Sequence, residues 1–216
     1  MSQVANIVLI LTILGMIAFA ISGAVAGARA GMDWLGLSTL AAVTAIGGGT
    51  LRDVLMTRTP SWLIDFWPSV LVVAGAVVVV WIGIRIAPGR GQHPWLVHVF
   101  SVTDAIGLAT FTIVGTDVAL AAGFASAPAV VLGVISGIGG GIIRDVIAGR
   151  RIEIFTGEVY ALAAAAGSIA FVLTRSFGGW VSLLLGLALT LTIRLGAIAL
   201  GWRVPTLAIS DPPARP

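Results

Sequence analysis

The residues that could do chemistry in this chain are concentrated in two copies of one motif, Gly-Gly-Gly-x-x-Arg-Asp, at residues 47–53 and 139–145. Each copy lies inside an apolar segment, where a charged side chain costs about 2.5 to 3.5 kcal/mol on insertion scales. Arg52, Asp53, Arg144 and Asp145 must therefore face the protein interior or water. Two compatible roles stay open for them: structural ion pairs between neighbouring helices, and the lining of a polar pathway.

Three consecutive glycines weaken a helix, because each one costs about 1 kcal/mol relative to alanine. A kink or a break is therefore expected at both triplets, Gly47, Gly48, Gly49, Gly139, Gly140 and Gly141. Backbone groups freed in lipid need protein or water as partners, so a broken helix fits best where it lines a cavity. Close helix packing is the alternative, although packing asks for glycines spaced by four, whereas consecutive glycines point in three directions.

Other polar residues in apolar segments are candidates for the same site. Asp104 lies about one third of the way into its segment, so it is a functional candidate, with a capping or interhelical hydrogen bond as the alternative. The hydroxyls of Thr44, Thr50 and Ser136 could supply oxygen ligands. The residues alone leave the sign of a transported ion open, since arginines would repel cations and the helix dipoles on either side of each triplet oppose one another.

Several kinds of chemistry are excluded or made improbable by composition. The chain has no cysteine and no lysine, and its only histidines are His93 and His98, so thiolate and Schiff-base catalysis are excluded and a metal site has few ligands. We expect no enzyme activity, no metal and no cofactor. All 12 basic residues are arginine and the net charge is only +3, so a nucleic-acid partner is not expected.

The elements that position these residues are membrane-spanning helices. The chain of 216 residues is 58% hydrophobic and only 10% charged, with a mean hydropathy of +1.10, whereas a soluble domain has about 25% charged residues. A helix needs about 20 mostly apolar residues to cross the hydrocarbon core. Seven segments qualify, at 4–28, 34–56, 66–86, 96–122, 127–148, 158–173 and 180–200. The sequence predicts an all-α integral membrane protein.

The chain also contains an internal repeat. A shift of 92 residues aligns its two halves without a gap and superimposes the two motifs. We expect a first three-helix repeat at 1–90, a second at 91–176, a seventh helix at 177–203 and an exposed tail at 204–216. Because each half has an odd number of spans, the second must have the opposite orientation, and inverted repeats place a pathway or binding site near the midplane.

Orientation follows from the arginines in the short loops. With the N-terminus outside, Arg58 and Arg175 are outside, and seven arginines are on the cytoplasmic side: Arg29, Arg85, Arg90, Arg150, Arg151, Arg203 and Arg215. Arg194 is six residues from the end of its segment and is expected to snorkel to the cytoplasmic boundary. We therefore expect a multi-pass protein with its N-terminus outside and its C-terminus in the cytoplasm.

The doubled glycine motif, the stretch Phe-Ala-Ile-Ser-Gly at 19–23 and the stretch Asp-Ala-Ile-Gly-Leu-Ala at 104–109 resemble the bacterial branch of the trimeric intracellular cation (TRIC) channels. The resemblance covers nearly the whole chain. It implies a homotrimer in the bacterial inner membrane, with a pore in each subunit around the second and fifth helices and potassium as the transported ion. Animal members bind an acidic phospholipid through a lysine-containing motif in the second helix, which this chain lacks because it has no lysine, so a bound lipid is a further ligand to test rather than one that the motif implies. On this reading the triplets are hinges and the arginine-aspartate pairs flank or gate the pore. The same branch has been labelled glycine-transporter-like, so a secondary transporter of a small solute is the alternative.

Overall fold

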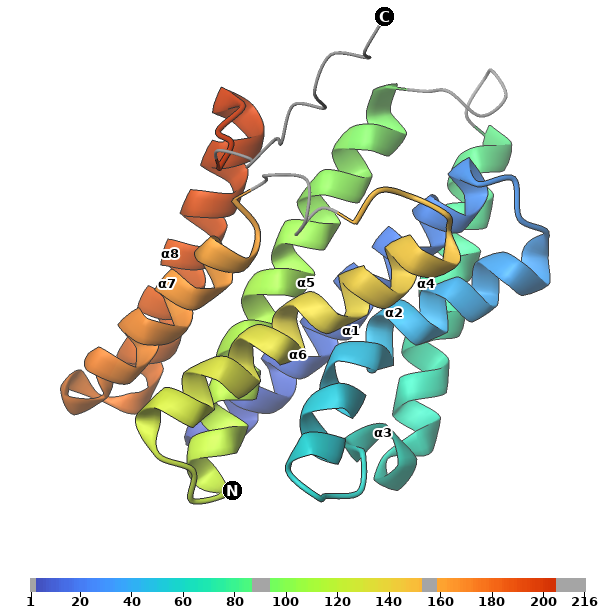
Figure 1. Ribbon diagram of the computed structural model, residues 1–216. Coiled ribbons are helices and arrows are strands. Elements are labelled where there is room, and N and C mark those ends of the chain that lie inside the picture. The colour runs from blue at the N-terminus through green and yellow to red at the C-terminus, as the bar shows by residue number, and fades with distance from the viewer. Residues whose placement is uncertain (1–2, 87–93, 153–158, 205–216) are drawn as a thin grey trace, which may run out of the picture.

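The computed structural model describes residues 3–86, 94–152 and 159–204, and over these ranges the chain is built from helices (Figure 1). The first repeat consists of α1 (Gln3–Arg29), α2 (Trp34–Leu55) and α4 (Phe66–Ile86), with the short α3 (Ser61–Ile64) before α4. Asp33 caps α2 by accepting a hydrogen bond of 2.7 Å from the Gly36 amide, which satisfies one of the free donors of the first turn.

The second repeat consists of α5 (Pro94–Ala121), α6 (Ser126–Ile147) and α7 (Ala161–Leu173), followed by a 3-10 turn, η2 (Arg175–Phe177), and by α8 (Gly179–Leu200). All seven predicted segments are present as helices. The sixth differs in its start, because α7 begins at Ala161 and residues 153–158 lie outside the described ranges. Its 13 residues span about 20 Å at 1.5 Å per residue, so α7 is shorter than the other six.

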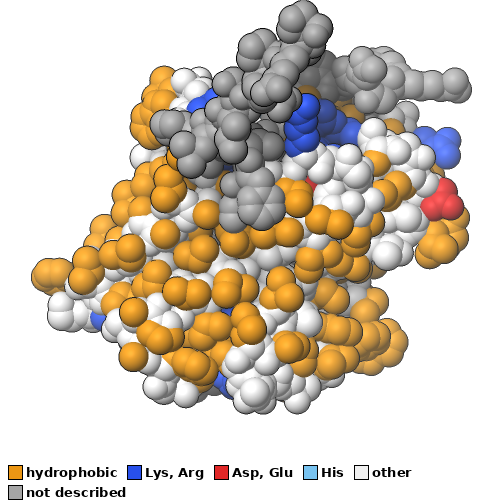
Figure 2. Space-filling view, in the orientation of Figure 1, with side chains coloured by type: hydrophobic (Ala, Val, Ile, Leu, Met, Phe, Trp, Pro, Cys, Tyr) orange, Lys and Arg blue, Asp and Glu red, His pale blue; other side chains and the backbone are white. Residues whose placement is uncertain are grey.

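The outer surface of the bundle is suited to lipid. Six helices are long and apolar enough to cross a membrane. Large apolar side chains face outward on these helices, among them Leu71, Val79 and Leu184, and also on the shorter α7, as Leu162 and Leu173 do. Figure 2 shows apolar side chains spread over the whole middle of one face, with arginine side chains gathered near its upper edge. Burial of charge inside and exposure of apolar groups outside is the arrangement expected of a membrane protein.

The two repeats contact each other as a symmetric pair. Helix α1 packs against α5, and α2 packs against α6, which are the equivalent helices of the two halves. Phe19 and Phe111, 92 residues apart, stack with ring centroids 5.4 Å apart and an interplanar angle of 8°. Each ring lies where a side chain at the glycine of the other helix would be, since Gly107 faces Phe19 and Gly15 faces Phe111. The fold is thus two inverted three-helix repeats plus the C-terminal α8, while the exact repeat boundaries stay a prediction.

Helices α2 and α6 cross at the glycine triplets. An α-helix continues through both triplets, so a break in the helix, one of the two expected outcomes, is wrong. The packing explains why three glycines are needed: a Cβ at Gly48 would meet the backbone carbonyl of Ser136, and a Cβ at Gly140 would meet that of Thr44. Packing is thus a role that the triplets do have in this structure, because a side chain at either position would force the helices apart.

Candidate functional site

The first copy of the motif forms an ion pair at one end of the α2/α6 crossing, which we call the first half-site. The Arg52 guanidinium donates to Asp53 Oδ1 from Nε at 2.9 Å and from Nη2 at 2.6 Å. Asp53 Oδ2 accepts a hydrogen bond of 3.0 Å from the Ser61 amide at the start of α3. The pair therefore holds α3 against the end of α2.

A cavity of about 610 Å³ adjoins this ion pair. Arg52 and Asp53 line it together with residues from α1, α3, α4 and α5, and Phe111 is among them. Its polar lining includes Thr50, whose hydroxyl donates to the Ile46 carbonyl at 2.8 Å and accepts from Trp62 Nε1 at 3.0 Å. The first half-site thus combines a buried charge pair with a hollow large enough for a small hydrated solute.

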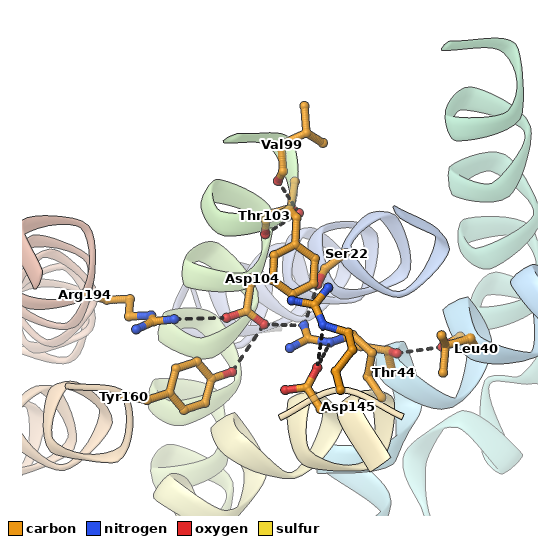
Figure 3. Close-up of polar contacts among 12 residues, drawn as sticks. Ser22, Leu40, Thr44, Val99, Thr103, Asp104, Asp145, Tyr160 and Arg194 are labelled. Carbon is orange, nitrogen blue, oxygen red and sulfur yellow. Dashed lines mark hydrogen bonds and ion pairs between the residues drawn. The ribbon is translucent and has the colours of Figure 1, made fainter. Parts of the chain in front are cut away.

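The second copy of the motif lies beyond the crossing, against α1 and α5, and forms a denser cluster that we call the second half-site (Figure 3). Arg144 is fully buried. It donates to Asp145 Oδ1 at 2.9 Å, to Ser22 Oγ at 2.6 Å and to Asp104 Oδ1 at 2.5 Å. The ring of Phe100 lies 4.4 Å from its guanidinium carbon. Arg144 therefore ties α6 to both α1 and α5.

Asp104 is the centre of the second half-site. Its Oδ1 accepts from Arg144 and also from Tyr160 Oη at 3.3 Å. Its Oδ2 is 3.9 Å from Arg194 Nη2 of α8, and the Arg194 guanidinium lies 4.7 Å from the centre of the Tyr160 ring. Figure 3 shows Tyr160 and Arg194 both directed at Asp104. Two buried arginines and two buried aspartates thus offset each other's charge, as buried charges in lipid require.

The expectation that Arg194 snorkels to the membrane boundary is wrong. Its side chain is 3% exposed and points into the bundle at Asp104. Ion pairing with a buried carboxylate removes the reason for an arginine to reach for water. A charged residue inside a predicted span indicates a functional or structural partner by default, and that signal could have identified Arg194 from the sequence.

The remaining predicted site residues lie at the crossing itself. Thr44 and Ser136 are both fully buried, and they occupy equivalent positions on α2 and α6. The Thr44 hydroxyl donates to the Leu40 carbonyl at 2.6 Å, whereas Ser136 Oγ has no hydrogen-bond partner among the described residues. The structure thus brings the predicted residues together in two separate half-sites joined by a close-packed crossing. Sequence reasoning missed Tyr160, Phe100 and the pairing role of Ser22.

Comparison with known proteins supports the repeat and identifies the family. The sequence model described as glycine transporter matches this chain twice, at residues 9–84 and 101–176. Both bounds of the second match follow those of the first by 92 residues, which is the offset found within the sequence. The UPF0126 inner membrane protein YadS of Escherichia coli (strain K12) is 38% identical over 93% of this chain and 96% of its own length. A UPF0126 membrane protein of Vibrio cholerae is 37% identical over 95% of this chain and 84% of its own.

Solved structures with the same fold are prokaryotic TRIC channels. One, crystallised in 0.5 M KCl, has a TM-score of 0.85 and 28% identity over 91% of this chain and 98% of its own. The TRIC trimeric intracellular cation channel orthologue from Rhodobacter sphaeroides has a TM-score of 0.82 and 31% identity over 91% of this chain and 99% of its own. These similarities support a cation channel and not an enzyme. The chain is a membrane protein that belongs to the bacterial TRIC channel family, whose sequence model carries the description glycine transporter.

Proposed function

We propose that this protein conducts monovalent cations, chiefly potassium, through a pathway inside each subunit. The pathway begins in the cavity of the first half-site, runs beside the close-packed α2/α6 crossing and leaves through the second half-site. The observation that carries the proposal is the fold shared with prokaryotic TRIC channels at TM-scores of 0.80 to 0.85, together with a charged, hollow half-site inside the subunit. Both half-sites contain paired aspartates, which offset the arginines along the route.

Potassium preference rests on the relatives, because the residues of the pathway include both signs of charge. One of the solved relatives is described as a trimeric intracellular cation channel, so we propose a homotrimer with one pathway per subunit and no nucleic-acid partner or cofactor. Lipid is a further proposed ligand, since apolar side chains cover the outer surface.

The proposed orientation places the first half-site outside and the second in contact with the cytoplasm. The loop arginines support this proposal, since it puts the loops and helix ends that carry Arg29, Arg85, Arg150, Arg151 and Arg203 on the cytoplasmic side. Arg90 and Arg215 lie outside the described residues. A reporter enzyme active only in the cytoplasm, fused after residue 216, should be active, and an inactive fusion would reverse the orientation.

Flux into liposomes tests the channel. Purified protein in liposomes loaded with potassium should release potassium down its gradient when a charge-compensating proton carrier is added, and liposomes with an unrelated membrane protein should not. The release should not saturate at low potassium, because a channel does not complete a binding cycle for each ion. Retention of potassium at every imposed voltage would contradict the proposal.

The second candidate is a secondary transporter of a small solute such as glycine. One observation favours it, the description of the matching sequence model, and inverted repeats are also known to build transporters. Uptake of labelled glycine that saturates and depends on an ion gradient would support this candidate. Unitary current steps carried by potassium without glycine would exclude it.

A further inference from the structure

The two half-sites occupy equivalent positions in the two repeats, yet they hold their arginines differently. Among the described residues, every hydrogen bond of the Arg52 side chain goes to the adjacent Asp53, and Arg52 lines a cavity. Arg144 makes the equivalent bond to Asp145 and adds bonds to Ser22 and Asp104. The second arginine is therefore fixed to two neighbouring helices, whereas the first is not.

The main cause is one difference between the repeats. The residue equivalent to Asp104, 92 positions earlier, is Thr12. Thr12 lines the cavity with Arg52, but its hydroxyl is taken up by its own helix, donating to the Val8 carbonyl at 2.8 Å. The second repeat thus has a carboxylate that binds its arginine, where the first repeat has a hydroxyl that hydrogen-bonds within its own helix and not to Arg52.

Two further pairs of equivalent residues differ in the same direction. Tyr160 supports Asp104 where the first repeat has Pro68, and Phe100 covers Arg144 where the first repeat has Val8. Pro68 and Val8 both line the cavity. Large aromatic groups therefore occupy space in the second half-site that is hollow in the first.

Helix α8 adds the last component and has no equivalent in the first repeat. Its Arg194 lies 3.9 Å from Asp104 Oδ2 and against the Tyr160 ring. Asp104 is thereby held between two arginines on two different helices, α6 and α8. Because buried ion pairs of this kind have discrete arrangements, they suit an element with two states.

We propose that Asp104 is a latch that holds the second half-site closed, and that its released form is the arrangement which the first half-site already displays. On release, Arg144 keeps Asp145 as its partner, loses Asp104 and faces a cavity equivalent to the one beside Arg52. This inference rests on the proposed pathway through both half-sites. It adds which half-site closes the pathway, which residue holds it, and what the open form looks like.

Thiol labelling of purified protein in detergent tests the latch without measuring current. The chain contains no cysteine, so single reporter cysteines need no other change. Val72 lines the existing cavity, and its equivalent Ala164 is fully buried beside Tyr160 and Leu108. With a water-soluble maleimide, V72C should label readily in the parent protein and A164C should be protected.

Exchange of the latch residue between the repeats should exchange this pattern. Asp104→Thr should raise the labelling rate of A164C about tenfold or more, since a buried charge-assisted hydrogen bond is lost from the closed form only. Thr12→Asp should give Arg52 a second carboxylate and lower the labelling rate of V72C, whereas Thr12→Asn, of similar size and without charge, should leave it unchanged. Unchanged labelling of A164C in a folded Asp104→Thr variant would overturn the proposal.

The design separates failure of the latch from failure to fold and from failure of the channel. If Asp104→Thr does not fold, Thr12→Asp decides, because the second half-site is then intact: lower labelling of V72C supports the latch and unchanged labelling overturns it. Labelling that follows the prediction in a protein that passes no current would retain the latch and refute the channel. Potassium current in the parent, together with unchanged labelling of A164C in the Asp104→Thr variant, would retain the channel and refute the latch.

Discussion

The replacement of Gly48 by alanine tests how tightly α2 and α6 must cross. An alanine Cβ there would lie 3.1 Å from the carbonyl carbon of Ser136, with the carbonyl oxygen closer still. Both atoms belong to the α6 backbone and cannot rotate away, so the helices must separate. Overpacking of this kind costs about 1 to 3 kcal/mol, and alanine recovers about 1 kcal/mol of helix propensity. With the clash at the upper end of that range, we expect a net loss of about 1 to 2 kcal/mol.

Gly75 supplies a matched control, because it lies in α4, another membrane-spanning helix, and a Cβ there would meet nothing within 4 Å. Gly75→Ala should therefore leave the free energy of unfolding unchanged or raise it by about 1 kcal/mol. Equilibrium unfolding in mixed detergent micelles, followed through the fluorescence of the 7 tryptophans, measures both variants. A Gly48→Ala protein as stable as the parent would refute close packing as the role of the triplet and favour a hinge.

Three further predictions follow from single contacts. Thr116→Val should lower the free energy of unfolding by about 1 to 3 kcal/mol, because it removes the 2.6 Å bond to Ser168 and leaves the Ser168 hydroxyl buried without that partner. The double variant with Ser168→Ala should lose less free energy of unfolding than the sum of the two single variants. Simple additivity of the two losses would argue against a hydrogen bond between these residues. Trp62→Phe should cost about 0.5 to 1.5 kcal/mol in an unfolding titration, since it removes the bond to Thr50, and no change in the Thr50→Val background is expected. Arg144→Ala should destabilise by about 3 to 5 kcal/mol, because it removes the nearest cation from two buried carboxylates and leaves them only the more distant Arg194 and Arg150. Expression at the parent's level with an unchanged melting temperature would contradict this.

The fold could be predicted from the sequence because its signals are local or periodic. Apolar runs between charged loops identified all seven spans, and the 92-residue offset identified the repeat. The short α3 was missed since Ser61–Ile64 is a single turn whose position depends on the bond from its Ser61 amide to Asp53. Such a contact between residues eight positions apart has no sequence pattern.

The site was predicted in part. The motif residues and Asp104 were chosen because charge inside a span is costly, and this reasoning applies at any position in the span. The same reasoning could have included Arg194, which was set aside because of its distance from the helix end. The partners of Asp104 could not be predicted, since Tyr160 and Arg194 come from helices α7 and α8 whose rotation about their axes depends on packing. The continuity of the helices through the triplets could not be predicted from the sequence either. The helix-propensity cost of three glycines and the free energy gained by close packing of the helices have opposite signs, and the sequence does not say which is larger.

Single-channel recording in a planar bilayer with unequal potassium chloride on the two sides tests the central claim most directly. A cation channel predicts discrete current steps whose reversal potential lies near the potassium equilibrium potential, and Asp104→Thr should raise the fraction of time spent open. Currents that reverse near the chloride equilibrium potential would contradict it. So would the absence of current in the bilayer when protein from the same preparation takes up glycine.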